Sequence, residues 1–509
     1  MKRYLSIAAV CSAILVCLPS SQSFDAQYLH LLTGDERAQL ELKRLHFGVD
    51  GDISKLRDIA VRAGDDYWLM ELASKDDVTS MLVLAERSTR ESTRINWLAR
   101  AANLGSAEGQ FQLALESDSV NKRLSLLLSS AQAGHLPAQH ALANWFIMNQ
   151  SVDDALPWLE KTANHYPDDA FALAKYYWQM ARVEEAKAYF LLAKDMGEQR
   201  AESYLQTVIE GPSTVDAIVS SKMVYTNIDR TPSDTKACAM NLLPVAKSLA
   251  NQVQAQQMIT QLQQDKRLSS LPICVSPPVW LEDSELTCEV KLRSGAQRMM
   301  CDLTQLEPIV TQHNVTHVIV FNPVGRAYVD MGAMYLDLND TYAVFVHELA
   351  HFAGFADEYP MSEHLADIHC EQQTAPNLLF AGEIAYEPHT RAAEWQRIIE
   401  LSDGKSLGIH SARTCNNVNR KAYKLTAART FLEFHDSEYI PEVYRTLWRE
   451  QLLAKRQWYP VSINIAHLYQ ERGMQSSASH WFNVAYNQSL QPAEQLQGVI
   501  DQNAEIAPK

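Results

Sequence analysis

A pattern of glycine, small residue and leucine recurs along the first part of the chain and constrains its fold more than any other feature. Each copy begins at a glycine, has a small or aromatic residue four positions later and a leucine eight positions later. The members are Gly64, Trp68 and Leu72; Gly105, Gly109 and Leu113; Gly134, Ala138 and Leu142; and Gly197, Ala201 and Leu205. A glycine at positive φ ends one helix, and small residues let the next helix pack closely. The segment from Phe24 to about Glu210 is therefore expected to consist of paired helices.

This pattern resembles the tetratricopeptide repeat (TPR) and related short α-solenoids, with irregular spacing and a degenerate copy at Tyr166, Ala170 and Ala174. Such stacks bury a continuous core by packing on their neighbours, and their concave face often binds partners. The resemblance implies an α-helical repeat solenoid that offers a surface to a protein partner; an ordinary helical bundle is the alternative. Small and aromatic residues near the C-terminus predict one more TPR-like helical hairpin: Ala466, Tyr469, Gly473, Ala478, Trp481 and Ala485.

The middle of the chain has a different pattern. Residues 316–321 are apolar and β-branched apart from one histidine, which predicts a buried strand. Residues 328–338 predict a second strand, at a sheet edge because a glycine interrupts it. Residues 341–352 predict a helix with Asn339 or Asp340 as its N-cap. Two strands followed by a helix indicate an α+β domain.

These changes in pattern predict the domain boundaries. The repeat domain is expected to end near the Gly-Pro-Ser-Thr loop over 211–214. The predicted segments are a signal peptide over 1–23, an α-helical repeat domain over 24–215, an α+β domain over 216–450 and C-terminal helices over 451–509.

The first residues have the pattern of an export signal. Lys2 and Arg3 precede an apolar run over 5–18, and Ser21 and Ser23 provide a small-x-small cleavage site before Phe24. The run is short for a membrane span, although an uncleaved anchor is the alternative. We expect an exported protein, periplasmic or secreted, with no transmembrane segment in the mature chain.

Cysteine usage agrees with export. Six cysteines remain after removal of the signal: Cys238, Cys274, Cys288, Cys301, Cys370 and Cys415. An even number in an exported protein permits up to three disulfides, with buried free thiols as the alternative. None lies in a CxxC pair.

The charge balance excludes one class of partner. The chain has 45 Lys and Arg against 61 Asp and Glu, a formal net charge of −16, and no basic run. Because binding to a phosphate backbone needs clustered Lys and Arg, no nucleic-acid partner is expected.

The segment over 346–360, VHELAHFAGFADEYP, carries the chemistry. His347 and His351 are four residues apart, so on a helix they lie on one face and can coordinate one tetrahedral Zn²⁺. Glu348 can act as general base on a zinc-activated water without being a ligand. The HExxH pattern alone is only moderately specific. The apolar residues around it predict a buried helix. Burial of two histidines and a glutamate is costly unless they are paired or bind a metal, so their presence there indicates a functional role.

A third ligand is expected beyond the helix. Gly354 lies where the helix has to stop, which favours a residue at positive φ. Asp357, three residues later, is the first side chain after that turn that suits zinc and can return to the two histidines. Its neighbour Glu358 should leave an extended strand on the opposite side. The alternatives for the third ligand are His364, His369, Glu371 and Glu383.

The run HELAHFAGFADEY resembles the zinc peptidases typified by bacterial IgA-specific metalloendopeptidases, as do GRAYVDMGA over 325–333 and the stretch over 375–377. The resemblance covers about 317–436 and implies a metzincin-like zinc peptidase domain with His347, His351 and Asp357 as ligands and Glu348 as general base. It does not imply IgA as substrate. A metzincin also has a methionine turn beneath its metal. Here only Met361 and Met474 follow the motif, and neither has a suitable position.

The sequence therefore predicts a zinc-dependent metalloendopeptidase that hydrolyses peptide bonds of exported proteins. Two other functions stay open. One is a non-enzymatic periplasmic scaffold with a structural metal site, which binds partners through its repeats. The other is zinc-dependent hydrolysis of a non-peptide amide, as in cell-wall material. A structural zinc usually has four protein ligands, whereas three ligands and a base favour an open catalytic site.

Overall fold

The computed structural model describes residues 53–228, 238–293, 296–363, 366–367, 370, 375–380, 391–401, 407–418, 420–434, 437–455 and 458–490. The predicted signal peptide over 1–23 lies outside these residues. The chain divides into two compact units, Met1–Glu202 and Ser203–Lys509. This division falls inside a helix, α14 (Ala201–Glu210), and the boundary expected from the sequence lies after that helix.

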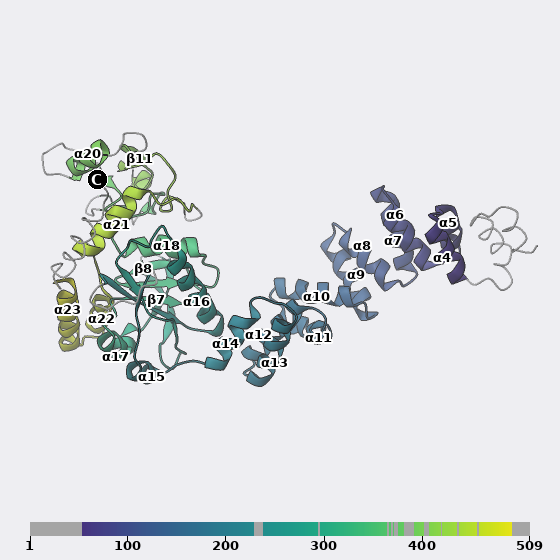
Figure 1. The fold of residues 1–509 in the computed structure, drawn as a ribbon, viewed down its shortest axis with the longest axis horizontal. Helices are drawn as coiled ribbons and strands as arrows, with labels where there is room; N and C mark the ends of the chain where they lie inside the picture. Colours follow the sequence, from purple (N-terminus) through teal and green to yellow (C-terminus); the bar gives the residue numbers. More distant parts are fainter. Residues whose placement is uncertain are drawn as a thin grey trace, which may run out of the picture. The chain divides into compact units, whose positions relative to one another are not determined.

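The described part of the first unit consists of helices joined by short turns (Figure 1). They are α4 (Ile53–Ala63), α5 (Asp66–Ser74), α6 (Val78–Arg87), α7 (Glu91–Asn103), α8 (Ala107–Leu115), α9 (Val120–Gln132), α10 (Leu136–Met148), α11 (Val152–Thr162), α12 (Pro167–Gln179) and α13 (Val183–Asp195). Each packs mainly on its neighbours in the chain. This arrangement is a solenoid-like stack of helical repeats and not a bundle around one common core.

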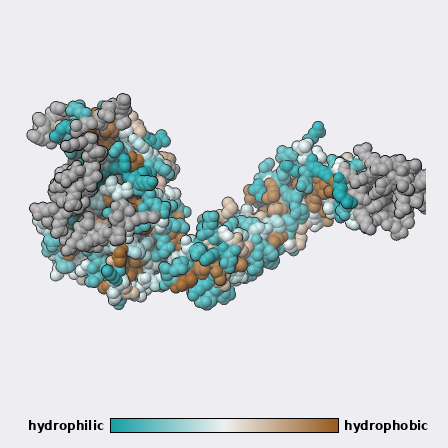
Figure 2. All heavy atoms as spheres, viewed as in Figure 1, coloured by the Kyte–Doolittle hydropathy of each residue, from teal (hydrophilic) through white to brown (hydrophobic). Residues whose placement is uncertain are grey.

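The recurring residues have the roles that their types suggest. Gly64, Gly105, Gly134 and Gly197 all have positive φ and lie directly after helices. A Cβ at Gly109 would lie 2.9 Å from the Cβ of Ala101, so only glycine lets α7 and α8 approach this closely. Leu72, Leu113 and Leu142 are buried, whereas Leu205 is only partly buried. Figure 2 shows hydrophobic residues on the surface among hydrophilic ones. Met148, for example, is 83% exposed.

A mixed sheet forms the centre of the second unit. Its strands are β1 (Thr226–Asn227), β2 (Met240–Ala246), β3 (Ile273–Val275), β4 (Val279–Trp280), β7 (His317–Phe321), β8 (Tyr328–Asp330) and β9 (Ala333–Leu336). Their order is β1-β3-β2-β7-β9-β8, with β4 also paired to β2. The pairs β2–β3, β2–β4, β2–β7 and β7–β9 are parallel, and the edge strands β1 and β8 are antiparallel.

Helices cover both faces of this sheet, which explains why its central strands are apolar throughout. On β7, Ile319 and Phe321 point into one hydrophobic cluster and Val318 and Val320 into the other. The first face carries α16 (Leu249–Gln264) and α18 (Tyr342–His351), and the second carries α15 (Val215–Ser220), η2 (Leu303–Leu306) and α17 (Glu307–Gln312). The predicted α+β arrangement is thus a layered mixed sheet with a parallel centre.

The elements around the sequence motif differ in detail from the expectation. The strand over 316–321 is confirmed as β7, which is buried throughout. The single strand expected over 328–338 is a hairpin, β8 and β9, which turns at Met331 and Gly332, both at positive φ. The helix over 341–352 is confirmed as α18, but its N-cap is Thr341, whose hydroxyl accepts a hydrogen bond from the Val344 amide, and not Asn339 or Asp340.

The C-terminal helical hairpin, α22 (Val461–Glu471) and α23 (Gln475–Leu490), shares a hydrophobic cluster with the sheet. The turn of the β8–β9 hairpin lies against its start: a Cβ at Gly332 would lie 2.3 Å from the Val461 nitrogen. Before it, α21 (Glu442–Ala454) runs through the predicted boundary at 450. The hairpin therefore packs within the second unit.

Smaller elements complete this unit. They are the hairpin β5 (Cys288–Arg293) and β6 (Ala296–Cys301), the helix α20 (Arg391–Leu401), the short turn η4 (Asn416–Val418) and a sheet of β10 (Leu379–Phe380), β12 (Ala422–Lys424) and β11 (His410–Ala412).

All six cysteines of this unit form disulfides, which confirms that prediction: Cys238–Cys274, Cys288–Cys301 and Cys370–Cys415. Such bonds are typical of proteins that fold outside the cytoplasm. In the described part of the chain, no helix is both long and apolar enough to cross a membrane.

Candidate metal centre

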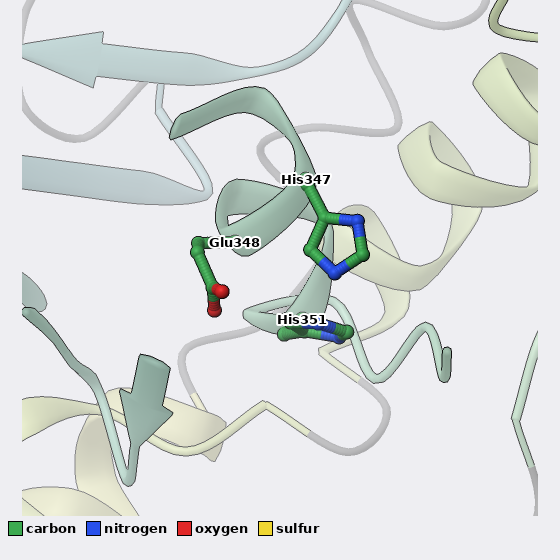
Figure 3. A group of neighbouring side chains, drawn as sticks. All are labelled: His347, Glu348 and His351. Carbon is green, nitrogen blue, oxygen red and sulfur yellow. The ribbon is translucent and has the colours of Figure 1, made fainter. Parts of the chain in front are cut away.

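Helix α18 positions three of the predicted side chains. Its apolar residues Phe345, Leu349 and Ala350 are fully buried against the sheet. The opposite face presents His347 and His351 one turn apart, with Glu348 beside them (Figure 3). One ligand atom from each of these three residues lies within 4.8 Å of the others, a spacing that could hold a metal ion.

The two imidazoles are oriented by backbone carbonyls. His347 Nδ1 lies 2.9 Å from the Phe431 oxygen, and His351 Nδ1 lies 2.7 Å from the Phe355 oxygen. Because a carbonyl oxygen can only accept a hydrogen bond, each Nδ1 must carry the proton. The Nε2 of each neutral ring is then left with a free lone pair. This is the usual arrangement of a histidine that binds a metal.

The predicted third residue reaches the same place. Helix α18 ends at His351, and Gly354 in the turn that follows has a φ of 78°, as the sequence predicted. The chain then returns so that Asp357 Oδ1 lies 2.9 Å from His347 Nε2 and 3.3 Å from His351 Nε2. Ligands about 2.0–2.2 Å from a tetrahedral zinc are about 3.3–3.6 Å from each other, so the 3.3 Å separation fits the ion and the 2.9 Å separation would widen by about 0.4 Å on binding.

The electrostatics of this corner favour a cation. Asp357 Oδ1 is buried and faces the two Nε2 atoms. Burial opposes its charge, but the two histidines outweigh it and hold the pKa of Asp357 well below its usual range. Burial likewise opposes the charged form of His351, but the Asp357 carboxylate raises the pKa of His351 to about 9. The carboxylate thus stabilises a positive charge beside it: without a metal this charge is a proton on His351, and a cation bound between the three groups would replace it. The donor set therefore fits a zinc ion.

Glu348 has a different environment from Asp357. Its side chain is almost entirely buried, and this burial, opposed in part by the two imidazoles, raises the pKa of its carboxyl. A raised pKa makes a carboxylate a stronger base, which suits a group that takes up a proton during a reaction. The side chains of His351 and Asp357 keep 19% and 18% exposure, so this corner is not closed to solvent.

The support beneath the histidines comes from aromatic residues. Phe431, whose carbonyl orients His347, stacks on Trp448 of α21 with ring centroids 6.1 Å apart. Met361 is buried in a separate cluster beside β10 and β12, and Met474 is 48% exposed. The loop at Phe431 thus supports His347 through its backbone carbonyl.

Sequence reasoning missed the residues that hold the Asp357 segment. It mentioned Glu358 only as a residue pointing away, which the structure confirms, and did not predict that Glu358 is fully buried among hydrogen-bond donors. Asn377 bonds both polar groups of the Ala356 backbone, its Oδ1 accepting from the amide at 3.0 Å and its Nδ2 donating to the carbonyl at 2.8 Å. A signal existed, because Asn377 belongs to one of the stretches that carried the family resemblance.

Tyr359 is a further residue at the site. Its ring lies nearly parallel to that of His347, with centroids 6.2 Å apart, and the residue is 39% exposed. Burial of the phenol and the neighbouring Asp357 carboxylate raise the pKa of Tyr359. The other residues considered as third ligands, His364, His369, Glu371 and Glu383, lie outside the described residues.

Comparisons with known proteins bear on the repeats alone. No protein-family model and no curated protein matches the chain. A protective antigen of uropathogenic Escherichia coli strains that displays an SLR fold is 19% identical with a TM-score of 0.26, over 38% of this chain and 47% of that one. A Sel1 repeat protein from Oxalobacter formigenes is 19% identical with a TM-score of 0.23, over 33% and 75% of the two chains.

The first of these matches spans about half the length of the solved chain. Both structures consist of Sel1-like helical repeats, a TPR-like class, but at these TM-scores neither likeness carries an argument. The solenoid-like character of the first unit rests on its own helices, and the metal centre rests on its own geometry.

Proposed function

We propose that this chain is a zinc-dependent peptidase that hydrolyses peptide bonds of proteins outside the cytoplasm. The observation that supports it most is the convergence of three ligand atoms: the buried Oδ1 of Asp357 lies 2.9 Å from His347 Nε2 and 3.3 Å from His351 Nε2. Those three residues would hold the metal. The resemblance of the segment over 347–359 to IgA-specific metalloendopeptidases points the same way.

The chemistry divides between the metal and Glu348. When bound, zinc supplies a Lewis acid that polarises a carbonyl and lowers the pKa of water near it. Glu348 lies beside the ligands without bonding to Asp357, and its raised pKa suits it to take a proton from water and pass it to the leaving amine. Tyr359, partly exposed and beside His347, is placed to contact the substrate.

Replacement of the base tests this division. Glu348→Gln keeps the shape of the side chain and removes its proton chemistry. It should reduce peptide hydrolysis by a factor on the order of 10²–10⁴ while the purified protein retains its zinc. Turnover of a mixed peptide library, with and without chelator, and zinc content by elemental analysis measure the two effects. Full activity in the variant would contradict the assigned role.

A second candidate is a non-enzymatic scaffold with a structural metal. One observation favours it: Glu348 lies within 4.8 Å of the histidine ligand atoms and could complete a closed four-ligand shell. The helical repeats would then provide the function by binding protein partners. The same variant separates the two candidates, because Glu348→Gln should lose zinc if Glu348 is a ligand and should retain it if Glu348 is a base.

Assays with two kinds of substrate test whether the enzyme hydrolyses peptide bonds or other amide bonds. Hydrolysis of the peptide library by the wild type, blocked by chelator and restored by zinc, supports a peptidase. Activity on cell-wall amides with none on the library would instead identify the metal centre as that of a non-peptide amidase.

A further inference from the structure

A buried charged network lies directly behind the proposed metal ligands. Its centre is Glu358, which is fully buried and has four side-chain donors. Its Oε1 accepts from Tyr444 Oη at 2.7 Å and Asn377 Nδ2 at 3.1 Å, and its Oε2 accepts from Thr430 Oγ1 at 2.6 Å and Lys424 Nζ at 3.2 Å. These donors lie 19, 66, 72 and 86 residues from Glu358 in the sequence. Glu358 therefore gathers separate parts of the second unit at one point.

Two of the three proposed ligands depend on the segments that Glu358 joins. Asp357 precedes it in the chain, and its own carbonyl is held by Thr414 Oγ1 at 2.7 Å. The Glu358 amide donates to the Leu432 carbonyl at 2.9 Å, while its carboxylate binds Thr430. Between Thr430 and Leu432 lies Phe431, whose carbonyl orients His347.

One carboxylate is thus connected to the aspartate on one side and to the partner of a histidine on the other. The connection to His347 runs through Thr430 and Phe431, and the connection to Asp357 runs through a single peptide bond. A shift of Glu358 would move both ligand groups relative to each other.

Stability of the fold alone does not explain a charge in this place. Removing two ions from water is costly, and well-packed apolar residues of similar volume often stabilise a fold as well or better. The pair of Glu358 with Lys424 is almost fully buried, and Lys424 also binds Glu433 at 2.6 Å. Hydrogen bonds to a carboxylate have fixed directions, which apolar packing lacks, so the network defines position.

We propose that Glu358 is a positioning residue for the metal centre: it holds Asp357 and the carbonyl that orients His347 in the arrangement that zinc requires. The inference rests on the proposed metal site, but not on catalysis there. Partners of metal ligands commonly change metal affinity by about 10–100-fold when they are replaced.

The test compares Glu358→Gln with the wild type by competition for Zn²⁺ against a chromophoric chelator. The variant should bind Zn²⁺ about 10–100-fold more weakly. In the Co²⁺-substituted protein, the visible absorption bands, which report ligand geometry, should change in position and intensity. A role in stability alone would change neither readout in the folded protein.

A matched control separates geometry from general destabilisation. Asp302 is a partly buried carboxylate in the same unit that binds Thr304 and Arg472, on the other face of the sheet. Asp302→Asn should lower thermal stability and leave the Zn²⁺ affinity and the Co²⁺ spectrum unchanged. If Glu358→Gln does not fold, Thr430→Val removes one donor of Glu358 and should weaken Zn²⁺ binding towards the lower end of the same range.

The outcomes distinguish this inference from the proposed function. Wild-type protein that binds no Zn²⁺ would overturn the metal centre and this inference with it. Wild-type protein that binds Zn²⁺, with equal affinity and an identical Co²⁺ spectrum in the folded Glu358 or Thr430 variant, would overturn the positioning role alone.

Discussion

The two units of this chain bring their residues together over different distances in the sequence. In the repeat unit, side-chain contacts between helices join residues about one repeat apart, such as Arg57 with Asp77, 20 residues on, and His140 with Asp169, 29 residues on. In the second unit, two of the contacts around the proposed metal site join residues much further apart in the sequence. His347 reaches Phe431 across 84 residues, and Glu358 reaches Tyr444 across 86.

The difference has a physical consequence. A stack of neighbouring contacts tolerates irregular spacing, because each interface depends only on adjacent helices. A site assembled from distant segments loses more loop-closure entropy on folding. Cross-links and strong buried contacts between those segments can offset that loss. The second unit contains three disulfides and the buried Glu358 network. The described helices of the repeat unit contain no disulfide.

Loss of a ligand should have the largest effect and be confined to the second unit. His347→Ala or His351→Ala removes one of the proposed ligands and should reduce zinc content from about one ion per chain to nearly none after dialysis. The helical signal of the repeats by circular dichroism should stay unchanged. Retention of zinc by both variants would show that the ion, if present, binds elsewhere.

Reduction of the disulfides should come next in size. Each bond in a domain of this kind contributes about 2–5 kcal/mol to the free energy of unfolding. Reductant should therefore lower the melting temperature of the second unit and not that of the repeats, as differential scanning calorimetry of the whole chain can measure. A single transition that shifts as a whole would show that the units unfold together.

A substitution that crowds α7 against α8 should lower the stability of the repeat unit by a smaller amount. Gly109→Ala places a Cβ 2.9 Å from Ala101 Cβ and 3.0 Å from the Ala102 nitrogen. This overpacking should destabilise the repeats by about 1–3 kcal/mol and leave zinc content unchanged. Ser129→Ala, at an exposed position of α9, is the matched control and should be neutral. Equal stability of the two variants would mean that α7 and α8 can separate without loss.

Separation of the units should have the smallest effect on the chemistry. Residues 24–210 alone should fold as a helical stack, and the remaining chain should cleave short peptides with unchanged kcat/KM. Circular dichroism of the isolated segment and peptide assays of the truncated protein are the measurements. An unfolded segment would place the repeats in the core of the second unit.

Prediction from the sequence succeeded where the signal was local. Gly354 turns the chain after α18 at positive φ, a conformation that glycine adopts most readily, and the HExxH spacing puts both histidines on one helical face. Prediction failed in detail at 328–338, where a strand pattern does not reveal that Met331 and Gly332 reverse the chain. It also chose the wrong N-cap, because three adjacent residues, Asn339, Asp340 and Thr341, are all suitable by type.

The sequence by itself determined the elements and their chemistry: the repeated helices, the buried strand β7, the helix with His347, Glu348 and His351, and Asp357 as the residue able to return to them. Periodicity and side-chain type are properties of neighbouring residues, so they can be read along the chain. Only the tertiary structure decided which cysteines pair, that Phe431 and Trp448 lie beneath the histidines, and that Glu358 is buried among four donors. Those contacts join residues between 13 and 86 positions apart, and no local pattern encodes which segments of the chain close on one another.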